Sequence, residues 1–326
     1  MSGEPELSRS SVLAAYETIK PFVHRTPLIT SSSLSASLPG GNALYFKAEN
    51  LQKGGAFKFR GASYSLERLS PEQLAKGVCT HSSGNHAGAL ALAAKERGAR
   101  CFVVMPSNSA PPKIAAVRAY GAHITFCAPS AAARAAALED VRARTGAAFV
   151  PPYDAAHTIL GQGTALLELL AQAPEHGERP AAVVVPVGGG GLLAGTALAA
   201  DGTGVRVFGA EPAGAADCAR GLREGRRVEE FVPETICDGL RTPVGKLNFP
   251  IIQEKVEDVI VVSDEEVVEA MKLMWERLKL VVEPSSATAF AAVRSEKFQA
   301  LGIKGPIAII ITGGNVDLSQ PLPWAA

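Results

Sequence analysis

Lys58 lies in a segment whose composition favours amine chemistry. Phe57 and Phe59 flank it, and a pair of glycines, Gly54 and Gly55, comes shortly before it. A charged amine is costly to bury, so an apolar setting lowers its pKa and makes it a better nucleophile. Such a lysine can form a Schiff base with a carbonyl cofactor. The ordinary alternative is a lysine whose stem covers the core while its amine reaches water, and the local spacing alone favours that alternative.

Four consecutive glycines, Gly188-Gly189-Gly190-Gly191, follow the apolar run 181–187 and precede a predicted helix that starts at Leu192. Because these residues lack Cβ atoms, their N–H groups can turn toward a single anion. The dipole of the following helix adds about 0.3–1 kcal/mol. A tight strand-to-helix turn does not need four glycines, each of which costs backbone entropy. We therefore interpret this loop as a phosphate-binding site.

The same loop also fits a dinucleotide-binding fingerprint. The segment from Gly189 to Ala194 reads Gly-x-Gly-x-x-Ala, and Glu211 ends the next predicted strand about twenty residues later. A nicotinamide-dependent dehydrogenase is therefore an alternative. It explains neither Lys58 nor the serine-rich loop described next, whereas a cofactor with a single phosphate accounts for all three features.

A serine-rich loop follows a predicted strand at 77–81 and enters a helix. It reads Ser82-Ser83-Gly84-Asn85-His86. Its N–H groups and hydroxyls suit a substrate carboxylate or a cofactor oxygen. An ordinary N-cap formed by Asn85 is the simpler interpretation, and the two are compatible. We interpret His86 as structural.

Thr312 comes directly after the predicted strand 307–311 and is followed by two glycines. Ligands of parallel α/β sheets bind beyond the carboxyl ends of the strands. We therefore expect Thr312 to face the same crevice as Gly188–Gly191. A plain C-terminal turn is the alternative and would be favoured if this segment were considered alone.

The elements that must position these residues alternate between strands and helices. We expect strands at 43–47, 77–81, 101–105, 124–127, 148–150, 181–187, 205–210 and 307–311. We expect helices at 11–22, 58–69, 86–98, 111–119, 130–144, 163–172, 192–200 and 264–278, and another after Pro284. Most of the strands are unbroken apolar runs, so the sheets should be parallel and covered by helices on both faces. The fold class is therefore α/β.

The order of these elements predicts two domains, as is usual for a chain of 326 residues. Residues 71–154 form a compact series of strands and helices that is typical of a small inserted domain. Residues 1–70 and 155–326 would then form a larger domain. No linker rich in proline or glycine marks the boundaries, and we find no internal repeat.

Composition excludes several classes of protein. The net charge is zero, the pI is near 7.0, and no basic block is present, which argues against nucleic-acid binding. No apolar run is long enough to cross a membrane, and the N-terminus lacks the features of a signal or transit peptide. The five cysteines form no Cys-x-x-Cys pair. We expect reduced thiols and a cytoplasmic location, with an organelle as an alternative.

Taken together, these segments resemble the fold-type II pyridoxal-phosphate enzymes, in particular the group of serine racemases and serine/threonine dehydratases. The similarity runs from Thr26-Pro27-Leu28 to Asn315-Val316-Asp317-Leu318, and it is most specific at 80–86 and 209–212. The resemblance implies two open, twisted parallel-sheet domains, like those of the tryptophan synthase β subunit, with pyridoxal 5'-phosphate in the cleft between them. We expect no regulatory domain of the threonine dehydratase type after Leu318.

The resemblance also implies an activity on a small amino acid. Lys58 would hold the cofactor and act as the base on one face of the substrate Cα, and Ser83 would be the acid and base on the opposite face. The implied reaction interconverts L- and D-serine, with accompanying β-elimination of serine to pyruvate and ammonia. An L-threonine/L-serine dehydratase or a threo-3-hydroxyaspartate dehydratase, without significant racemisation, would use the same residues. A cofactor-holding protein without catalytic activity is a further alternative.

The remaining contacts to the cofactor and the substrate are implied in the same way. Phe57 would pack on the ring, Asn85 would bond the 3-hydroxyl, and Thr312 would meet the pyridine nitrogen. Gly188, Gly189, Gly190, Gly191 and Leu192 would bind the phosphate. The substrate carboxylate would be held by Ser82, Ser83, Gly84, Asn85 and His86.

Three further expectations follow from the resemblance. Glu211, the carbonyl of Ala215 and Asp217 match a divalent-cation site, and such ligands suit Mg²⁺, Ca²⁺ or Mn²⁺. On spacing alone the two acids would be ordinary surface residues. Lys113 falls where the mammalian enzyme contacts a nucleotide, so ATP is a candidate activator, although the flanking positions differ. We expect a homodimer.

Overall fold

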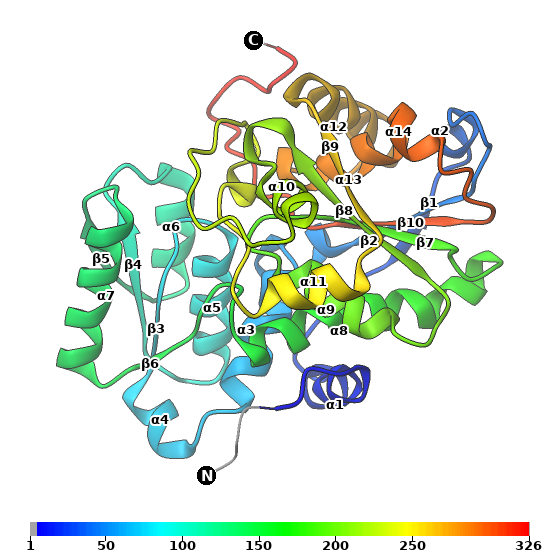
Figure 1. Ribbon diagram of the computed structural model, residues 1–326. Helices are drawn as coiled ribbons and strands as arrows, with labels where there is room; N and C mark the ends of the chain where they lie inside the picture. Colours follow the sequence, from blue (N-terminus) through cyan, green and yellow to red (C-terminus); the bar gives the residue numbers. More distant parts are fainter. Residues whose placement is uncertain (1–4, 326) are drawn as a thin grey trace.

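The computed structural model describes residues 5–325, which form two mainly parallel β-sheets covered by helices (Figure 1). The larger sheet has six strands in the order β1-β2-β10-β7-β8-β9. Its strands are β1 (Leu28–Thr30), β2 (Leu44–Ala48), β7 (Ala182–Pro186), β8 (Arg206–Pro212), β9 (Asp258–Val262) and β10 (Ile307–Ile311). The central strands β2, β7 and β10 are buried along their whole length, as expected for a sheet covered on both faces.

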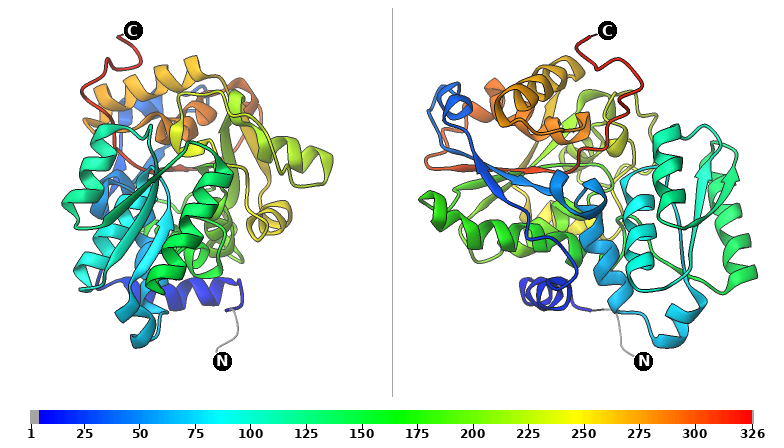
Figure 2. Two further views of the ribbon diagram at one scale, coloured as in Figure 1. Left: turned by 90° about the vertical axis from the view of Figure 1, so that its left-hand side faces the viewer. Right: turned by 180° about the vertical axis from the view of Figure 1, so that it is seen from behind.

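The smaller sheet has four parallel strands in the order β5-β4-β3-β6. They are β3 (Val78–His81), β4 (Cys101–Pro106), β5 (His123–Cys127) and β6 (Ala148–Phe149). All four come from the segment predicted as an inserted domain. The view from behind in Figure 2 shows this segment grouped on one side of the six-stranded sheet. The division into a small domain at 71–154 and a large domain at 1–70 and 155–326 stays a proposal.

Helices cover both sheets. Those outside the inserted segment are α1 (Arg9–Ile19), α2 (Ser32–Ala36), α3 (Lys58–Glu67), α8 (Ala156–Gln172), α9 (Gly191–Ala200), α10 (Asp217–Glu224), α11 (Asn248–Lys255), α12 (Asp264–Leu278), α13 (Pro284–Arg294) and α14 (Glu296–Gln299). Those within it are α4 (Pro71–Lys76), α5 (Asn85–Glu96), α6 (Pro111–Ala119) and α7 (Ala131–Thr145).

Glycines bring the backbones of α3, α8 and α9 into direct contact. A Cβ atom on Gly161 of α8 would lie 2.7 Å from the Cα of Gly61 on α3. Two residues further along α8, on its opposite face, a Cβ on Gly163 would lie 2.4 Å from the carbonyl oxygen of Gly195 on α9. No side chain fits at either crossing. Helix α8 therefore fixes the position of α3, which starts at Lys58, relative to α9, which starts at the tetraglycine loop.

A buried ion network also holds α3 in place. The Arg60 guanidinium donates to both carboxylate oxygens of Glu49, each at 2.7 Å, and to both oxygens of Glu168, at 2.9 and 2.8 Å. Lys47 donates to Glu168 at 2.8 Å and to the Thr26 carbonyl oxygen at 2.7 Å. All four charged side chains are almost completely buried. Because each cation has carboxylate partners, the burial of these charges is compensated.

Several elements differ from the sequence-based expectations. Strand β1 is antiparallel to β2 and closes one edge of the large sheet, and β9 extends the other edge. Neither was predicted, because three-residue and partly exposed strands give little periodic signal. Helix α8 begins at Ala156, seven residues before the predicted start. The glycines at 161 and 163 suppressed the helical pattern there, although close packing requires them.

The described part of the chain contains no helix long and apolar enough to cross a membrane. All five cysteines are free, and all but Cys127 are buried, in agreement with the expected reduced thiols. Burial raises the pKa of the Cys101 thiol to about 12. The four buried thiols are therefore packing groups rather than nucleophiles.

Candidate active site

Lys58 is the first residue of α3 and is partly buried. Its Nζ atom donates to the carbonyl oxygen of Pro152 at 2.7 Å and lies 5.0 Å from the centroid of the Phe57 ring. No carboxylate pairs with this amine in the described part of the chain. Removal from water therefore acts alone and lowers the pKa of Lys58 to about 8. This lowered pKa fits the predicted role of Lys58 as a nucleophilic amine, which stays a prediction.

Thr312 and the residues around Lys58 are joined directly. The backbone N–H of Phe57 donates to the carbonyl oxygen of Thr312 at 2.9 Å, and Ala56 forms a β-bridge with Gly313. Thr312 follows β10, which is parallel to β7, the strand that leads into the tetraglycine loop. The carboxyl ends of both strands therefore open on the same edge of the sheet, as predicted.

The tetraglycine loop, residues 188–191, presents only backbone atoms, and we call it the glycine cradle. Gly190 has φ of 85°, a conformation that glycine adopts without strain. A Cβ atom on Gly189 would lie 2.3 Å from the Tyr153 ring, and one on Gly191 would lie 2.8 Å from the Tyr153 carbonyl oxygen. Within the described chain, the N–H groups of Gly188, Gly189 and Gly190 donate no hydrogen bond. Unpaired N–H groups beside a helix N-terminus fit an anionic phosphate.

The segment Pro152-Tyr153-Asp154 connects Lys58 with this cradle. The carbonyl oxygen of Pro152 accepts from Lys58, while the ring of Tyr153 lies against Gly189. Asp154 accepts from the backbone N–H groups of Lys246 and Leu247, each at 2.9 Å. The amine and the glycine loop, far apart in sequence, therefore contact two consecutive residues, Pro152 and Tyr153.

Asn248 braces the cradle from behind. This side chain is fully buried, and its amide donates to the carbonyl oxygen of Gly189 at 2.6 Å. The N–H of Gly245 donates to the same oxygen at 3.1 Å. Because both bonds hold the Gly189 carbonyl on one side, the N–H of Gly190, which belongs to the same trans peptide group, points to the other side.

The serine loop leads from β3 into α5. Ser83 is partly buried, and its hydroxyl makes no hydrogen bond with other described residues. His86 is buried, and its Nε2 atom contacts the Val150 carbonyl oxygen at 3.1 Å. Burial, together with the nearby Lys58 charge, lowers the pKa of His86 to about 3, so the ring is neutral at physiological pH. Since a carbonyl can only accept, Nε2 carries the proton. The buried Nδ1 atom then has no hydrogen to donate, and it has no hydrogen-bond partner among the described residues.

Asn85 does not form the N-cap of α5, so the simpler interpretation of the serine-rich loop is wrong at this residue. The helix begins at Asn85 itself, and Gly84 occupies the N-cap position without a side-chain bond. The Asn85 amide instead donates to Glu283 at 2.8 Å and accepts from Asn315 at 2.8 Å. Burial, followed by the charge of Asp238, raises the pKa of Glu283 to about 7. Asn85 thus links α5 to α13 and to the segment after β10.

Thr312 is buried and faces Ser286 of α13. Their hydroxyl oxygens are 2.8 Å apart, and Ser286 also bonds the backbone of Gly313. Ser286, Glu283, Tyr153 and Asn248 are residues that the sequence did not single out. Each one meets the site through a partner distant in the chain, so no local pattern marks it.

Glu211 and Asp217 lie together in a buried position. Glu211 accepts from the N–H groups of Cys218 and Ala219, at 3.0 and 2.9 Å. One oxygen of Asp217 accepts from Val244 at 2.9 Å, while the other is buried and has no partner. Burial raises the pKa of both carboxyl groups, and the neighbouring Asp217 charge further raises that of Glu211. The described residues contain no cluster of three His, Cys, Asp or Glu side chains that could hold a metal.

The position of Glu211 argues against a dinucleotide-binding site. In that fingerprint the acidic residue at the strand end bonds a ribose hydroxyl. Here Glu211 is completely buried, and both of its oxygens are bonded to α10. The Gly-x-Gly-x-x-Ala match is therefore not accompanied by an exposed carboxylate that could bond a ribose hydroxyl.

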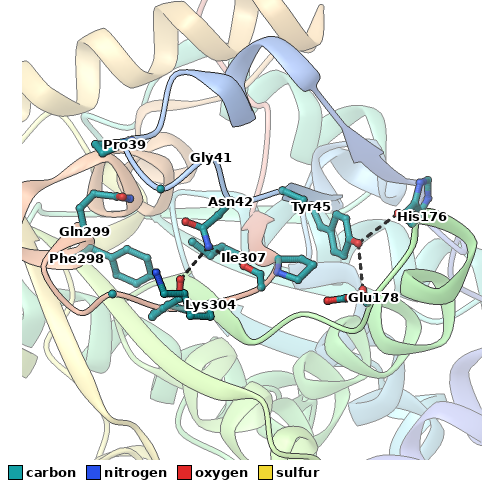
Figure 3. Close-up of a pocket in the computed structure, with 16 residues that line it drawn as sticks. Pro39, Gly41, Asn42, Tyr45, His176, Glu178, Phe298, Gln299, Lys304 and Ile307 are labelled. Carbon is teal, nitrogen blue, oxygen red and sulfur yellow. Dashed lines mark hydrogen bonds between the residues drawn. The ribbon is translucent and has the colours of Figure 1, made fainter.

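Lys113 of α6, in the inserted segment, forms an ion pair with Asp238 of the chain outside that segment. It also lines a cavity of about 130 Å³, together with Asn85, Tyr120 and Asn315. A larger groove of about 630 Å³ lies at the amino-terminal ends of β2 and β10 (Figure 3). There Asn42 and Tyr45 donate to backbone carbonyl oxygens, and none of the predicted site residues lines it.

Comparisons with known proteins agree with this arrangement. A family model described as "Pyridoxal-phosphate dependent enzyme" matches residues 19–313. The chain is 44% identical over 310 residues to a serine racemase from Dictyostelium discoideum, covering 94% of each protein. It is 43% identical to a beta-hydroxyaspartate dehydratase from Paracoccus denitrificans, covering 96% of this chain and 97% of that one. The structure of maize serine racemase superposes with a TM-score of 0.92 at 44% identity, covering 96% of this chain and 94% of that one.

Proposed function

The chain belongs to the pyridoxal-phosphate-dependent enzyme family, and we propose that it is a serine racemase that also eliminates water from serine to give pyruvate and ammonia. The observation that carries this proposal is the pairing of Lys58 with the glycine cradle. The desolvated amine contacts Pro152, and the loop with unpaired N–H groups contacts Tyr153. They match two neighbouring groups of the cofactor, its aldehyde and its phosphate.

The residues of this site fit the cofactor. A Cβ at Gly189 or Gly191 would overlap Tyr153, so the cradle requires glycine. Gly188–Gly191 and Leu192 would bind the phosphate, Lys58 would bond the aldehyde carbon, and Phe57 would pack on the ring. Asn85 would bond the 3-hydroxyl and Thr312 the ring nitrogen. When bound, the cofactor supplies a conjugated ring that takes up the electron pair left when the substrate Cα loses its proton.

Two groups on opposite faces of the substrate would then move protons. Lys58, with a pKa of about 8, can release and accept a proton near neutral pH. Ser83, whose hydroxyl is unengaged, would deliver a proton to Cα from the other face. Removal by one group and return by the other inverts the configuration. Loss of the β-hydroxyl before the return gives elimination instead.

The serine loop would hold the substrate carboxylate. Its helix N-terminus offers the N–H groups of Asn85 and His86, and Ser82 and Ser83 add hydroxyls. The N–H of Gly84 donates to Ser82 Oγ at 3.3 Å, so Gly84 would contribute only if that bond were exchanged for one to the substrate. The neutral imidazole of His86 donates its only N–H proton to the Val150 carbonyl oxygen. His86 would therefore bind the substrate carboxylate through its backbone N–H. Neutral His86 also keeps an additional positive charge away from Lys58.

A dehydratase acting on threo-3-hydroxyaspartate, or on L-threonine and L-serine, is the second candidate. It is supported by the 43% identity to the Paracoccus denitrificans dehydratase, which is nearly as high as that to the racemase. The experiment is chiral product analysis with L-serine, D-serine, L-threonine and 3-hydroxyaspartate. We expect D-serine from L-serine together with pyruvate. Ammonia and keto acid without any D-serine would favour the dehydratase.

We further propose a divalent-cation site formed by Glu211, the carbonyl of Ala215 and Asp217. The buried Asp217 oxygen that has no hydrogen-bond partner among the described residues supports this proposal. Oxygen ligands of this kind suit Mg²⁺, Ca²⁺ or Mn²⁺. The ion would stabilise α10 and the loop that leads to Val244, rather than take part in the chemistry.

The remaining proposals concern partners and location. Lys113 lines a small cavity beside Asn85, so a nucleotide such as ATP could bind there and influence the cofactor site. Titration of the protein with ATP, compared with a Lys113→Ala variant, tests this. We also propose a cytoplasmic homodimer, which analytical ultracentrifugation and cell fractionation would test.

A further inference from the structure

Asn248 contacts two separate parts of the proposed cofactor site. Its amide nitrogen donates to the carbonyl oxygen of Gly189 in the glycine cradle at 2.6 Å and to the carbonyl oxygen of Tyr153 at 3.3 Å. Tyr153 follows Pro152, whose carbonyl oxygen accepts from Lys58. Asn248 is completely buried, so no bulk water competes for these bonds. One side chain therefore bonds both the cradle and the segment that receives the lysine amine.

The chemistry of the amide fixes the orientation of this side chain. A carbonyl oxygen can only accept, so the atom that faces both carbonyls must be the nitrogen, which carries two protons. The Oδ1 atom of Asn248 then points elsewhere and is buried without a hydrogen-bond partner among the described residues. An unpaired buried acceptor costs stability. The arrangement therefore satisfies Gly189 and Tyr153 at the expense of the Asn248 oxygen.

Packing and hydrogen bonding limit the spacing of the two segments from opposite directions. A Cβ atom on Gly189 would lie 2.3 Å from the ring of Tyr153, and one on Gly191 would lie 2.8 Å from its carbonyl oxygen, so the segments are already in close contact. No backbone hydrogen bond joins residues 152–154 to residues 188–191 in the part of the chain that the structure describes. The two bonds from Asn248 therefore resist separation of the segments.

A second, indirect connection runs through the turn before α11. Gly245 donates to the carbonyl oxygen of Gly189, and the two residues after Gly245 donate their backbone N–H groups to Asp154. This connection does not use the Asn248 side chain and remains when that side chain is replaced. We therefore expect an Asn248 variant to fold with an intact cradle whose distance from the Pro152-Tyr153 segment is less well fixed.

We propose that Asn248 is a positioning residue that sets the distance between the glycine cradle and Lys58, so that one pyridoxal phosphate molecule can bind to both. The inference rests on the proposed function, in which the cradle binds the phosphate and Lys58 bonds the aldehyde. When both groups belong to one molecule, the second binding event is intramolecular and gains from a high effective concentration. That gain is lost when the spacing no longer matches the cofactor.

The test compares pyridoxal phosphate with pyridoxal, which has the aldehyde and no phosphate, in wild-type and Asn248→Ala proteins. Schiff-base absorbance gives the dissociation constants, and Lys58→Ala protein is the blank for other lysines. We expect the affinity of the variant for pyridoxal phosphate to fall by about tenfold, the change that corresponds to one hydrogen bond. Its affinity for pyridoxal should stay at the wild-type value, whereas a general loss of structure would weaken both ligands together.

Inorganic phosphate, measured as a competitor of pyridoxal phosphate, reports on the cradle alone. Its affinity should also be unchanged in Asn248→Ala, because Gly245 still bonds the Gly189 carbonyl. A fall equal to that for pyridoxal phosphate would place the effect in the shape of the cradle and would overturn the inference about spacing.

Asn42→Ala is the matched control. The Asn42 amide also donates to two backbone carbonyl oxygens, those of Ile303 at 2.9 Å and Gly305 at 2.8 Å, but it lines the groove at the amino-terminal ends of β2 and β10 (Figure 3). This control should keep the wild-type ratio of the two affinities.

Two outcomes overturn the role of Asn248: unchanged affinity for pyridoxal phosphate, or an equal loss for pyridoxal. If circular dichroism shows that Asn248→Ala is unfolded, Asn248→Thr replaces it, with a smaller fall expected because one hydroxyl proton cannot bond two carbonyls. Wild-type protein that binds pyridoxal as tightly as pyridoxal phosphate would instead overturn the assignment of the cradle to the phosphate, and with it the proposed function of that loop.

Discussion

Replacement of Gly163 by alanine should separate the two helices on which the site depends. The new Cβ would lie 2.4 Å from the carbonyl oxygen of Gly195 and 2.8 Å from its carbonyl carbon. Backbone atoms cannot rotate away as a side chain can. Helix α8 would therefore have to move from α9 by roughly an ångström to restore an ordinary contact, and the cradle at the start of α9 would move relative to Lys58.

The magnitude follows from two opposing effects. Overpacking a tight core contact costs about 1–3 kcal/mol. Alanine is the better helix former by about 1 kcal/mol, which offsets part of this cost. We expect a net destabilisation of about 1–2 kcal/mol. We also expect weaker cofactor binding, because the Lys58 amine and the glycine cradle would no longer have the spacing that the aldehyde and the phosphate of one cofactor molecule require.

Two measurements check this prediction, the thermal unfolding of the apoprotein and the dissociation constant of pyridoxal phosphate from absorbance. Gly88→Ala is the matched control, since Gly88 also lies in a helix and its Cβ would find only Tyr120, at an ordinary 3.8 Å. That control should be as stable as the wild type or more stable. A Gly163→Ala protein that matched Gly88→Ala in both measurements would refute the argument that the α8–α9 crossing positions the site.

Three other substitutions address the chemistry, the pH dependence and the metal. Ser83→Ala should abolish racemisation of L-serine while leaving some elimination, and equal loss of both activities would show that the two-base assignment is mistaken. Burial raises the pKa of Glu283 to about 7, so the folded protein binds this proton more tightly than the unfolded chain does. The stability contributed by that proton is present below the unfolded pKa and is lost as the pH rises through 7. Thermal unfolding between pH 5 and 8 should therefore show the wild type losing up to roughly 3 kcal/mol relative to Glu283→Gln, and parallel pH profiles would contradict this. Asp217→Ala should remove activation by Mg²⁺ or Ca²⁺, whereas Asp201→Ala, on an exposed turn, should retain it; an unchanged response in Asp217→Ala would eliminate the proposed site.

The sequence was informative where chemistry and local structure coincide. Lys58 between two phenylalanines and four adjacent glycines after an apolar strand are local patterns, and the structure places both in contact with the segment Pro152-Tyr153. The parallel order of the central strands also followed from their apolar runs, because strands buried on both faces have no polar side. The position of Thr312 then followed from the rule for strand ends.

The supporting residues were not predictable in this way. Tyr153 packs on a glycine that lies 36 positions later, and Asn248 bonds the same loop from α11. Ser286 is one of several small residues in an Ala-rich helix, and only the contact with Thr312 distinguishes it. Such residues gain their roles from tertiary contacts, which have no periodicity along the chain. The glycines of α8 even misled the helix assignment, because they weaken a helix in isolation and are needed where two helices touch.

The central claim is that Lys58 is the residue covalently bonded to the cofactor. Purified protein incubated with pyridoxal phosphate should be yellow, and borohydride reduction followed by peptide mapping should find the cofactor on Lys58 alone. Lys58→Ala protein should show no such peptide. A colourless protein, or a cofactor fixed to another lysine such as Lys53 or Lys113, would contradict the account.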